Sequence, residues 1–126
     1  MVAVLVVDDS KLARIVAGKA IAALQPDWQR IEAGSAADAL QILDEQQIDV
    51  AILDFNMPDK DGLELAAEIR AKNASMPIAI ITANVQDEVI LRVRELNATF
   101  VAKPVTQEAL SGFLSGAALR LKKAAP

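Results

Sequence analysis

The chain has 126 residues, which is enough for one domain with a substantial hydrophobic core. Apolar residues make up 53% of it and charged residues 24%, a balance typical of a globular protein rather than a disordered one. The formal net charge is −4, so no nucleic-acid binding through a basic face is expected. Cysteine and histidine are both absent, which excludes disulfides, zinc–thiolate sites and phosphohistidine chemistry within this chain.

The apolar segments bear on localisation. The longest runs, residues 2–7 and 77–81, are far too short to span a membrane. The N-terminus also lacks the charged start and long apolar stretch of a signal peptide. We therefore expect a cytoplasmic protein without membrane insertion.

Short apolar runs rich in β-branched residues are the expected strands. They cover residues 2–7, 50–53 and 78–81, with weaker candidates at 29–32 and 100–102. The strong runs are continuous rather than alternating, which is typical of strands buried on both faces of a parallel sheet.

Helices are expected between these strands, over residues 10–24, 35–46, 62–72, 86–96 and 106–122. Ser10, Ser35 and Thr106 are suitable N-caps for three of them, because a side-chain oxygen accepts a bond from a free backbone N–H of the first turn. Asn97 follows the fourth helix where a left-handed residue is common, and asparagine tolerates that conformation.

The order of elements is five repeats of strand then helix, which predicts an α/β fold with a parallel sheet and helices on both faces. No linker, internal repeat or low-complexity segment divides the chain. We predict one domain over residues 1–122 and a C-terminal tail over 123–126.

Polar residues follow the predicted strands at their carboxyl ends, where open parallel sheets bind ligands. Asp8 and Asp9 follow the first strand, Asp54 the third, Thr82 the fourth and Lys103 the fifth. Three carboxylates, one hydroxyl and one ammonium are therefore expected to meet at one edge of the sheet.

Three carboxylates in a small space repel one another, and a hard divalent cation such as Mg²⁺ relieves that repulsion. Lys103 and Thr82 then supply a positive charge and a hydrogen-bond donor for phosphoryl oxygens. This donor set suits a phosphate that is accompanied by Mg²⁺.

The order of these residues on five strand–helix repeats closely resembles the response-regulator receiver domains of two-component signalling. The residues that carry the resemblance are Asp8-Asp9, Asp54, Thr82 and Lys103-Pro104. The resemblance covers essentially the whole chain and extends to the loop of residues 54–62. It implies a flavodoxin-like, doubly wound (βα)5 fold with strand order 2-1-3-4-5. It also implies a cis Lys103–Pro104 bond.

The resemblance implies roles for the acidic residues. Asp54 would be the nucleophile that takes the phosphoryl group and would share Mg²⁺ with Asp9, which binds the metal directly. Asp8 would act on the metal mainly through water, and Asn56 would offer its backbone carbonyl. Asn56 and Asn84 also occupy the two positions that tune dephosphorylation in the family.

The remaining site residues implied by the resemblance surround the phosphoryl group. Thr82 and the Ala83 amide would contact it, Lys103 would form an ion pair with it, and Phe100 matches the aromatic switch position. The segment from Asn97 to Lys103 departs from the family pattern. It begins Asn-Ala instead of Gly-Ala and is one residue shorter, which affects the surroundings of Phe100 and not the acceptor site.

The resemblance implies a phosphorelay function. The phosphoryl donor would be a phosphohistidine on a sensor histidine kinase or a histidine phosphotransfer protein. Separately, the first helix has more apolar residues than one buried face requires, so Leu12 and Ile15 are candidates for docking this donor; the alternative is an alanine-rich helix with scattered exposed apolar residues. Output would pass through the fourth helix, fifth strand and fifth helix to a downstream protein or a second copy of the chain. We expect a phospho-acceptor with slow self-dephosphorylation rather than an enzyme.

Four alternatives compete with this interpretation. A phosphate sink or shuttle would accept phosphate without an output of its own. A receiver that acts only as a protein-binding scaffold usually lacks one of the acid, Thr or Lys positions, and none is missing here. A haloacid-dehalogenase-like phosphatase needs a carboxylic acid two residues after the nucleophile, where Asn56 stands. A flavin-binding module needs a phosphate loop that Asp8 and Asp9 would repel, and the chain has one Trp and no Tyr to sandwich a flavin.

Overall fold

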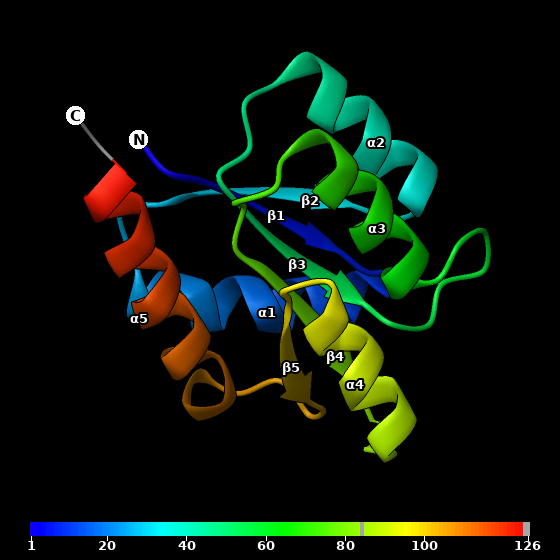
Figure 1. The fold of residues 1–126 in the computed structure, drawn as a ribbon. Helices are drawn as coiled ribbons and strands as arrows, with labels where there is room; N and C mark the ends of the chain where they lie inside the picture. Colours follow the sequence, from blue (N-terminus) through cyan, green and yellow to red (C-terminus); the bar gives the residue numbers. More distant parts are fainter. Residues whose placement is uncertain (84, 125–126) are drawn as a thin grey trace.

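The computed structural model describes residues 1–83 and 85–124, in which strands and helices alternate along the chain (Figure 1). The strands are β1 Ala3–Val7, β2 Gln29–Ala33, β3 Val50–Asp54, β4 Ile78–Thr82 and β5 Thr99–Ala102. The helices are α1 Lys11–Leu24, α2 Ala36–Glu45, α3 Gly62–Lys72, α4 Asp87–Glu95 and α5 Gln107–Ala124. The ten predicted elements are confirmed; α5 extends past residue 122, where the fifth helix was expected to end.

The five strands form one parallel sheet in the order β2-β1-β3-β4-β5, which confirms the predicted topology. Because every strand runs the same way, the carboxyl ends of β1, β3, β4 and β5 lie along one edge. Asp54 is the last residue of β3 and Thr82 the last of β4. The chain order reverses between β1 and β3, which places a topological switch point at Asp8 and Asp54.

Helices cover both faces of the sheet and bury two separate apolar layers (Figure 1). On one face α2, α3 and α4 pack against side chains such as Leu5, Leu53 and Ile80. On the other, α1 and α5 pack against side chains such as Val6 and Ile52. Burial on both sides explains the continuous apolar runs of β1, β3 and β4, whereas the edge strands β2 and β5 are partly exposed and carry polar residues.

The predicted helix caps are confirmed. The hydroxyl of Ser10 accepts from the Ala13 N–H at 3.2 Å, and that of Thr106 accepts from the Ala109 N–H at 3.0 Å. Ser35 caps α2 in the same way, through the N–H of Asp38 at 3.1 Å. None of the helices within residues 1–83 and 85–124 is both long and apolar enough to cross a bilayer.

Two backbone expectations near β5 are also confirmed. Asn97, after α4, has a positive φ of 54°, the left-handed conformation expected of an asparagine at that position. The Lys103–Pro104 bond, directly after β5, is cis.

Candidate functional site

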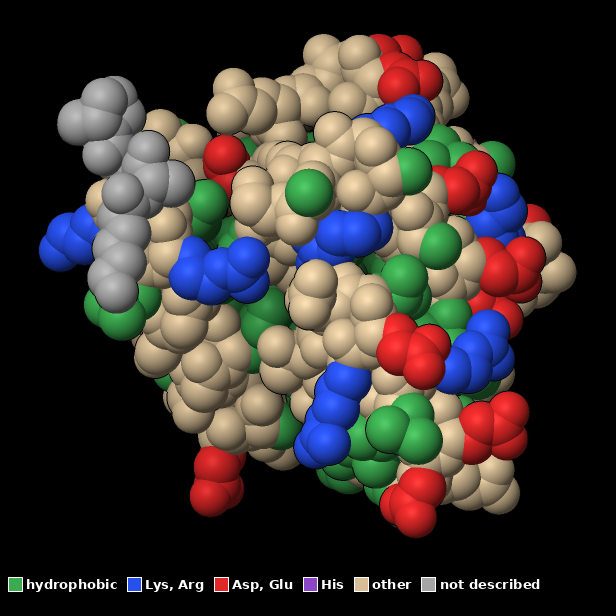
Figure 2. Space-filling model, in the orientation of Figure 1, with side chains coloured by type: hydrophobic (Ala, Val, Ile, Leu, Met, Phe, Trp, Pro, Cys, Tyr) green, Lys and Arg blue, Asp and Glu red, His purple; other side chains and the backbone are tan. Residues whose placement is uncertain are grey.

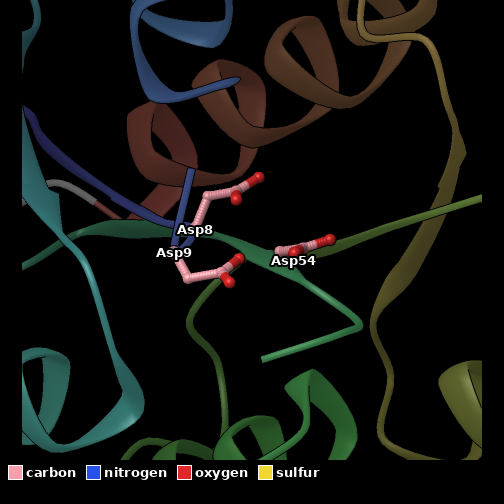
Figure 3. Close-up of side chains that lie close together, drawn as sticks. All are labelled: Asp8, Asp9 and Asp54. Carbon is pink, nitrogen blue, oxygen red and sulfur yellow. The ribbon is translucent and has the colours of Figure 1, made fainter. Parts of the chain in front are cut away.

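Carboxylates from two strands gather at the carboxyl edge of the sheet. One oxygen from each of Asp8, Asp9 and Asp54 lies within 4.8 Å of the others, and Figure 3 shows the three side chains beside one another. Asp8 and Asp54 are buried, with 7% and 4% of their surface exposed, while Asp9 is exposed. The predicted meeting of these three side chains is confirmed.

Burial and repulsion act together on Asp8. Loss of solvent raises the pKa of its carboxyl, and the negative charges of Asp54 and Asp9 raise it further. The backbone N–H of Ser10, which donates to Asp8 Oδ1 at 2.9 Å, opposes this rise and lowers the pKa. The charge of Lys103 also lowers the pKa, but the net direction is upward, chiefly because the Asp8 carboxyl is buried.

Lys103 brings a positive charge to this cluster from the residue after β5. Its Nζ lies 2.9 Å from Oδ1 of Asp54. Burial on its own lowers the pKa of Lys103, but ion pairing with Asp54 and attraction to Asp8 and Asp9 outweigh it, so the pKa is raised. The lysine therefore remains protonated at neutral pH.

Oδ1 of Asp54 is the unusual atom of the site. It is buried and accepts no hydrogen bond from the described residues, so its contact with Lys103 is an ion pair without hydrogen-bond alignment. A buried carboxylate oxygen is normally hydrogen-bonded, and an exception points to a missing ion or a reactive group. This oxygen is available to a cation or an electrophile.

The donor set fits Mg²⁺. Three carboxylates supply hard oxygen ligands, and one of the oxygens is buried without a hydrogen bond. Mg²⁺ prefers such ligands and retains several waters, which the exposed position of Asp9 allows. The sequence contains no histidine or cysteine that would favour a softer metal.

Beneath the site, Gly62 lies very close to the backbone of Asp54 and Phe55, a contact that the sequence did not predict. A Cβ at Gly62 would lie 2.4 Å from the carbonyl oxygen of Asp54 and 3.1 Å from the Cα of Phe55. The Gly62 N–H donates to the Phe55 carbonyl at 2.9 Å, which closes the loop between β3 and α3. Only glycine fits this contact, and the one available signal was a glycine directly after the Asp61 N-cap.

Two further residues outside the prediction stabilise the surrounding loops. Asp59 accepts from the N–H groups of Ala36 and Ala37 at 3.3 and 3.1 Å, and so joins the β3–α3 loop to the start of α2. Arg14 donates to the Asp8 carbonyl at 2.6 Å and pairs with Glu32 at 2.9 Å. The contacts of Asp59 with Ala36 and Ala37 and of Arg14 with Glu32 join residues 18 to 23 positions apart and leave no pattern in the local sequence.

Of the other predicted site residues, Thr82, Ala83 and Asn56 lie at or directly after the carboxyl ends of their strands, and Phe100 lies within β5. Thr82 is fully buried at the end of β4, and Ala83 and Asn56 are exposed. Phe100 is half-buried and pairs in register with Ile80, two residues before Thr82, so both side chains lie on the sheet face covered by α4. Asn84 lies outside the described residues.

A doubly wound parallel sheet with an acidic cluster and a lysine at its carboxyl edge defines the phospho-acceptor domains of two-component signalling. The family model of the response regulator receiver domain matches residues 4–114, and the chain belongs to this family.

Individual relatives support the assignment to this family. Over 121 residues the chain is 34% identical to the sensor histidine kinase RcsC of Salmonella typhi, which covers 95% of this chain and 13% of RcsC. It is 32% identical over 116 residues to the transcriptional regulatory protein MalR of Bacillus subtilis, covering 91% of this chain and 49% of MalR. The chain thus spans a small part of the one and about half of the other.

The fold has close structural neighbours. The chemotaxis protein CheY4 of Vibrio cholerae superposes with a TM-score of 0.83 at 27% identity, covering 93% of this chain and 98% of that one. A receiver domain from Clostridium thermocellum gives a TM-score of 0.82, also at 27% identity, with 99% and 100% covered.

Proposed function

We propose that Asp54 accepts a phosphoryl group from a phosphohistidine on a partner protein, in a reaction that requires Mg²⁺. The observation that carries the proposal is the buried Asp54 Oδ1, which accepts no hydrogen bond from the described residues, beside two carboxylates and 2.9 Å from an ammonium. An oxygen so placed is held near both a positive charge and the acidic cluster, where an incoming phosphorus would meet it.

Asp8, Asp9, Asp54 and the backbone carbonyl of Asn56 would hold the metal. When bound, Mg²⁺ neutralises carboxylate charge and stabilises charge on the phosphoryl oxygens. Asp9 is exposed and suits a direct ligand that shares the ion with water, while the Ser10 N–H orients the carboxylate of Asp8.

In the transfer step a carboxylate oxygen of Asp54 attacks the phosphorus. An O–P bond forms, the P–N bond to the donor imidazole breaks, and its electron pair leaves with the imidazole. Lys103 offsets charge on the phosphoryl oxygens, and the Thr82 hydroxyl and Ala83 N–H donate to them. The chain supplies positions and charges, and the attack of a carboxylate, unlike that of a hydroxyl group, requires no general base.

An exposed apolar surface beside the site supports a protein donor. Leu12, Ile15 and Val16 on α1 are 71%, 41% and 42% exposed. A groove of about 280 Å³ between α1 and the β5–α5 loop runs from Asp8 along Leu12 and Val16 to Lys103 and Pro104. Apolar surface at the mouth of a charged site favours docking of a sensor kinase or a phosphotransfer protein.

The mass of the intact protein tests the acceptor assignment. Acetyl phosphate with Mg²⁺ should add one phosphoryl group to the wild type and none to Asp54→Asn, which keeps the shape and removes the nucleophile. Asp27→Asn, at an exposed turn far from the site, is the matched control and should be modified like the wild type. Equal modification of Asp54→Asn and the wild type would refute the assignment.

Output is proposed to pass through the surface of α4, β5 and α5. The Thr82 hydroxyl gains new acceptor oxygens once Asp54 is phosphorylated, and its movement opens space on the sheet face that it shares with Phe100. A ligand shifts such an equilibrium only by its different affinity for the two states. Thr82→Ala should therefore weaken the coupling while Asp54 still accepts phosphate.

Amide-resolved NMR with and without beryllofluoride measures this coupling. The expected shifts in α4 and β5 are large in the wild type and much smaller in Thr82→Ala. Equal shifts in both proteins would exclude the Thr82 step, and an absence of shifts in the wild type would favour the phosphate sink over a switched output.

A further inference from the structure

Arg14 on α1 is more covered than an ordinary surface cation. Figure 2 shows Lys and Arg side chains lying on the surface of one face of the molecule, which is the usual place for these residues. Only 17% of the Arg14 side chain is exposed, and a Cβ built at Gly34 would lie 3.4 Å from its Nη1. The guanidinium is therefore packed against the turn between β2 and α2, where a largely covered charge needs polar partners.

Two partners hold this guanidinium in place. Its Nε donates to Oε1 of Glu32 on β2 at 2.9 Å, and its Nη1 donates to the backbone carbonyl of Asp8 at 2.6 Å. The planar fork of a guanidinium reaches both oxygens from one position, whereas a lysine ammonium is a compact point charge. Arg14 thus ties the residue that follows β1 to the edge strand β2.

The carbonyl that Arg14 holds belongs to the peptide group between Asp8 and Asp9. A peptide group is planar, so an anchored oxygen also fixes the Cα of Asp9 and the direction in which its side chain leaves the backbone. Asp8 has two more anchors, because its N–H donates to the Ala33 carbonyl at 3.1 Å and its Oδ1 accepts from the Ser10 N–H at 2.9 Å. Asp9 takes part in no ion pair with the described residues, so its carboxylate depends on this backbone for its position.

We infer that Arg14 is a positioning residue of the metal site, which aims the Asp9 carboxylate by holding the Asp8–Asp9 peptide group. Its polar contacts are with a backbone oxygen and with Glu32, so it acts on the metal only through the acidic pair. The carboxylate of Glu32 offsets the charge of the guanidinium, and the Arg14–Glu32 pair therefore brings little net positive charge to a site that must attract a cation. The inference rests on the metal site of the proposed function and adds a residue to it.

The affinity for Mg²⁺ tests this role. A titration with Mg²⁺ followed by amide NMR shifts should give Arg14→Gln a Kd roughly tenfold above that of the wild type, as for other residues that orient a metal ligand. Arg14→Lys should lose affinity to a similar extent, because it keeps the charge without the fork. Arg30 lines the same groove between α1 and β2, beside Gly18, and Arg30→Gln is the matched control whose Kd should equal that of the wild type.

Hydrogen exchange of the metal-free protein gives a readout that involves neither Mg²⁺ nor phosphoryl transfer. The Ser10 N–H donates to Asp8 Oδ1, so this amide should exchange several-fold faster in Arg14→Gln, relative to the amides of β3 that report global unfolding. Glu32→Gln is a milder variant that leaves the contact with the Asp8 carbonyl. Its Kd for Mg²⁺ should lie between those of the wild type and Arg14→Gln.

Phosphorylation by acetyl phosphate separates aiming of the metal ligand from general damage. The rate of Arg14→Gln should fall at limiting Mg²⁺ and approach the wild-type rate at saturating Mg²⁺. An unchanged Mg²⁺ Kd in Arg14→Gln, a Kd fully restored in Arg14→Lys, or a rate that stays low at saturating Mg²⁺ would each overturn the positioning role. A wild type that takes up no phosphoryl group, while Arg14→Gln still loses Mg²⁺ affinity, would contradict the acceptor function and leave the positioning role standing.

Discussion

Replacing Gly62 by alanine should damage the acceptor site from beneath. The new Cβ would lie 2.4 Å from the carbonyl oxygen of Asp54, whereas Cβ atoms essentially never approach closer than 3.0 Å, so the two segments must separate by about 0.6 Å. Such overpacking costs roughly 1–3 kcal/mol, and better helix propensity returns at most about 1 kcal/mol. When the full gain is subtracted, a net loss of up to about 2 kcal/mol remains, which lowers the Tm by up to roughly 10 °C.

The same displacement moves the Asp54 carboxylate. Misplacement by about 1 Å can cost roughly a hundredfold in rate, so a shift of about half that size should slow phosphorylation by acetyl phosphate about tenfold. The assays are thermal unfolding and the time course of intact mass. Gly18→Ala is the matched control, because the nearest atom to its Cβ is the flexible Arg30 Cδ at 4.0 Å, and it should stabilise the protein by about 0.5–1 kcal/mol. If Gly62→Ala is as stable and as reactive as the wild type, the close approach does not constrain the site.

Two other perturbations follow from the charges. Mg²⁺ at about ten to a hundred times its Kd should stabilise the fold by roughly 1–3 kcal/mol, and Asp9→Ala should remove most of that effect; a wild-type Tm indifferent to millimolar Mg²⁺ would contradict the metal site. The pKa of Asp59 is lowered chiefly by its hydrogen bond with the Ala37 N–H. The stability that this carboxylate contributes is therefore fully present above the ordinary aspartate pKa and is lost as the pH falls through the lowered pKa of the folded state. Asp59→Asn should therefore reduce the Tm at neutral pH and lose its effect in strong acid, whereas a deficit independent of pH would assign the contact another origin.

The sequence was sufficient to predict the architecture because its local strand, helix and cap patterns all favour the same overall fold. Three continuous apolar runs and two weaker strand candidates, separated by helical stretches, leave a doubly wound parallel sheet as the simple solution. Parallel strands then bring Asp8, Asp54 and Lys103 to one edge as a geometric necessity, although they are far apart along the chain. The acidic cluster and its lysine could thus be predicted without any distance.

The contacts that hold this edge in place could not be predicted, because they join loops whose paths depend on the completed fold. Arg70 is an example. From α3 it donates to the carbonyls of Leu96 and Asn97 after α4, at 2.9 and 3.2 Å, and to those of Asn73 and Met76 before β4, at 3.2 and 2.7 Å. The segment that departs from the family pattern therefore begins at Asn97, whose backbone carbonyl is held by Arg70. The composition of the segment alone does not reveal this contact.

The balance of formal charges shows why the proposed site would suit a divalent cation together with a phosphoryl group. Asp8, Asp9 and Asp54 contribute three negative charges and Lys103 one positive charge, which leaves two negative charges when all four groups are ionised. A divalent cation brings that sum to zero, whereas a monovalent cation leaves a net negative site that still repels phosphate. Burial raises the pKa of the Asp8 carboxyl, and the charges of Asp54 and Asp9 raise it further, whereas the hydrogen bond with Asp54 and the charges of Asp54, Asp8 and Asp9 raise the pKa of Lys103 against the opposite effect of its burial. A divalent cation held by the three carboxylates would therefore leave this edge neutral toward an incoming phosphoryl group, which the carboxylates would otherwise repel.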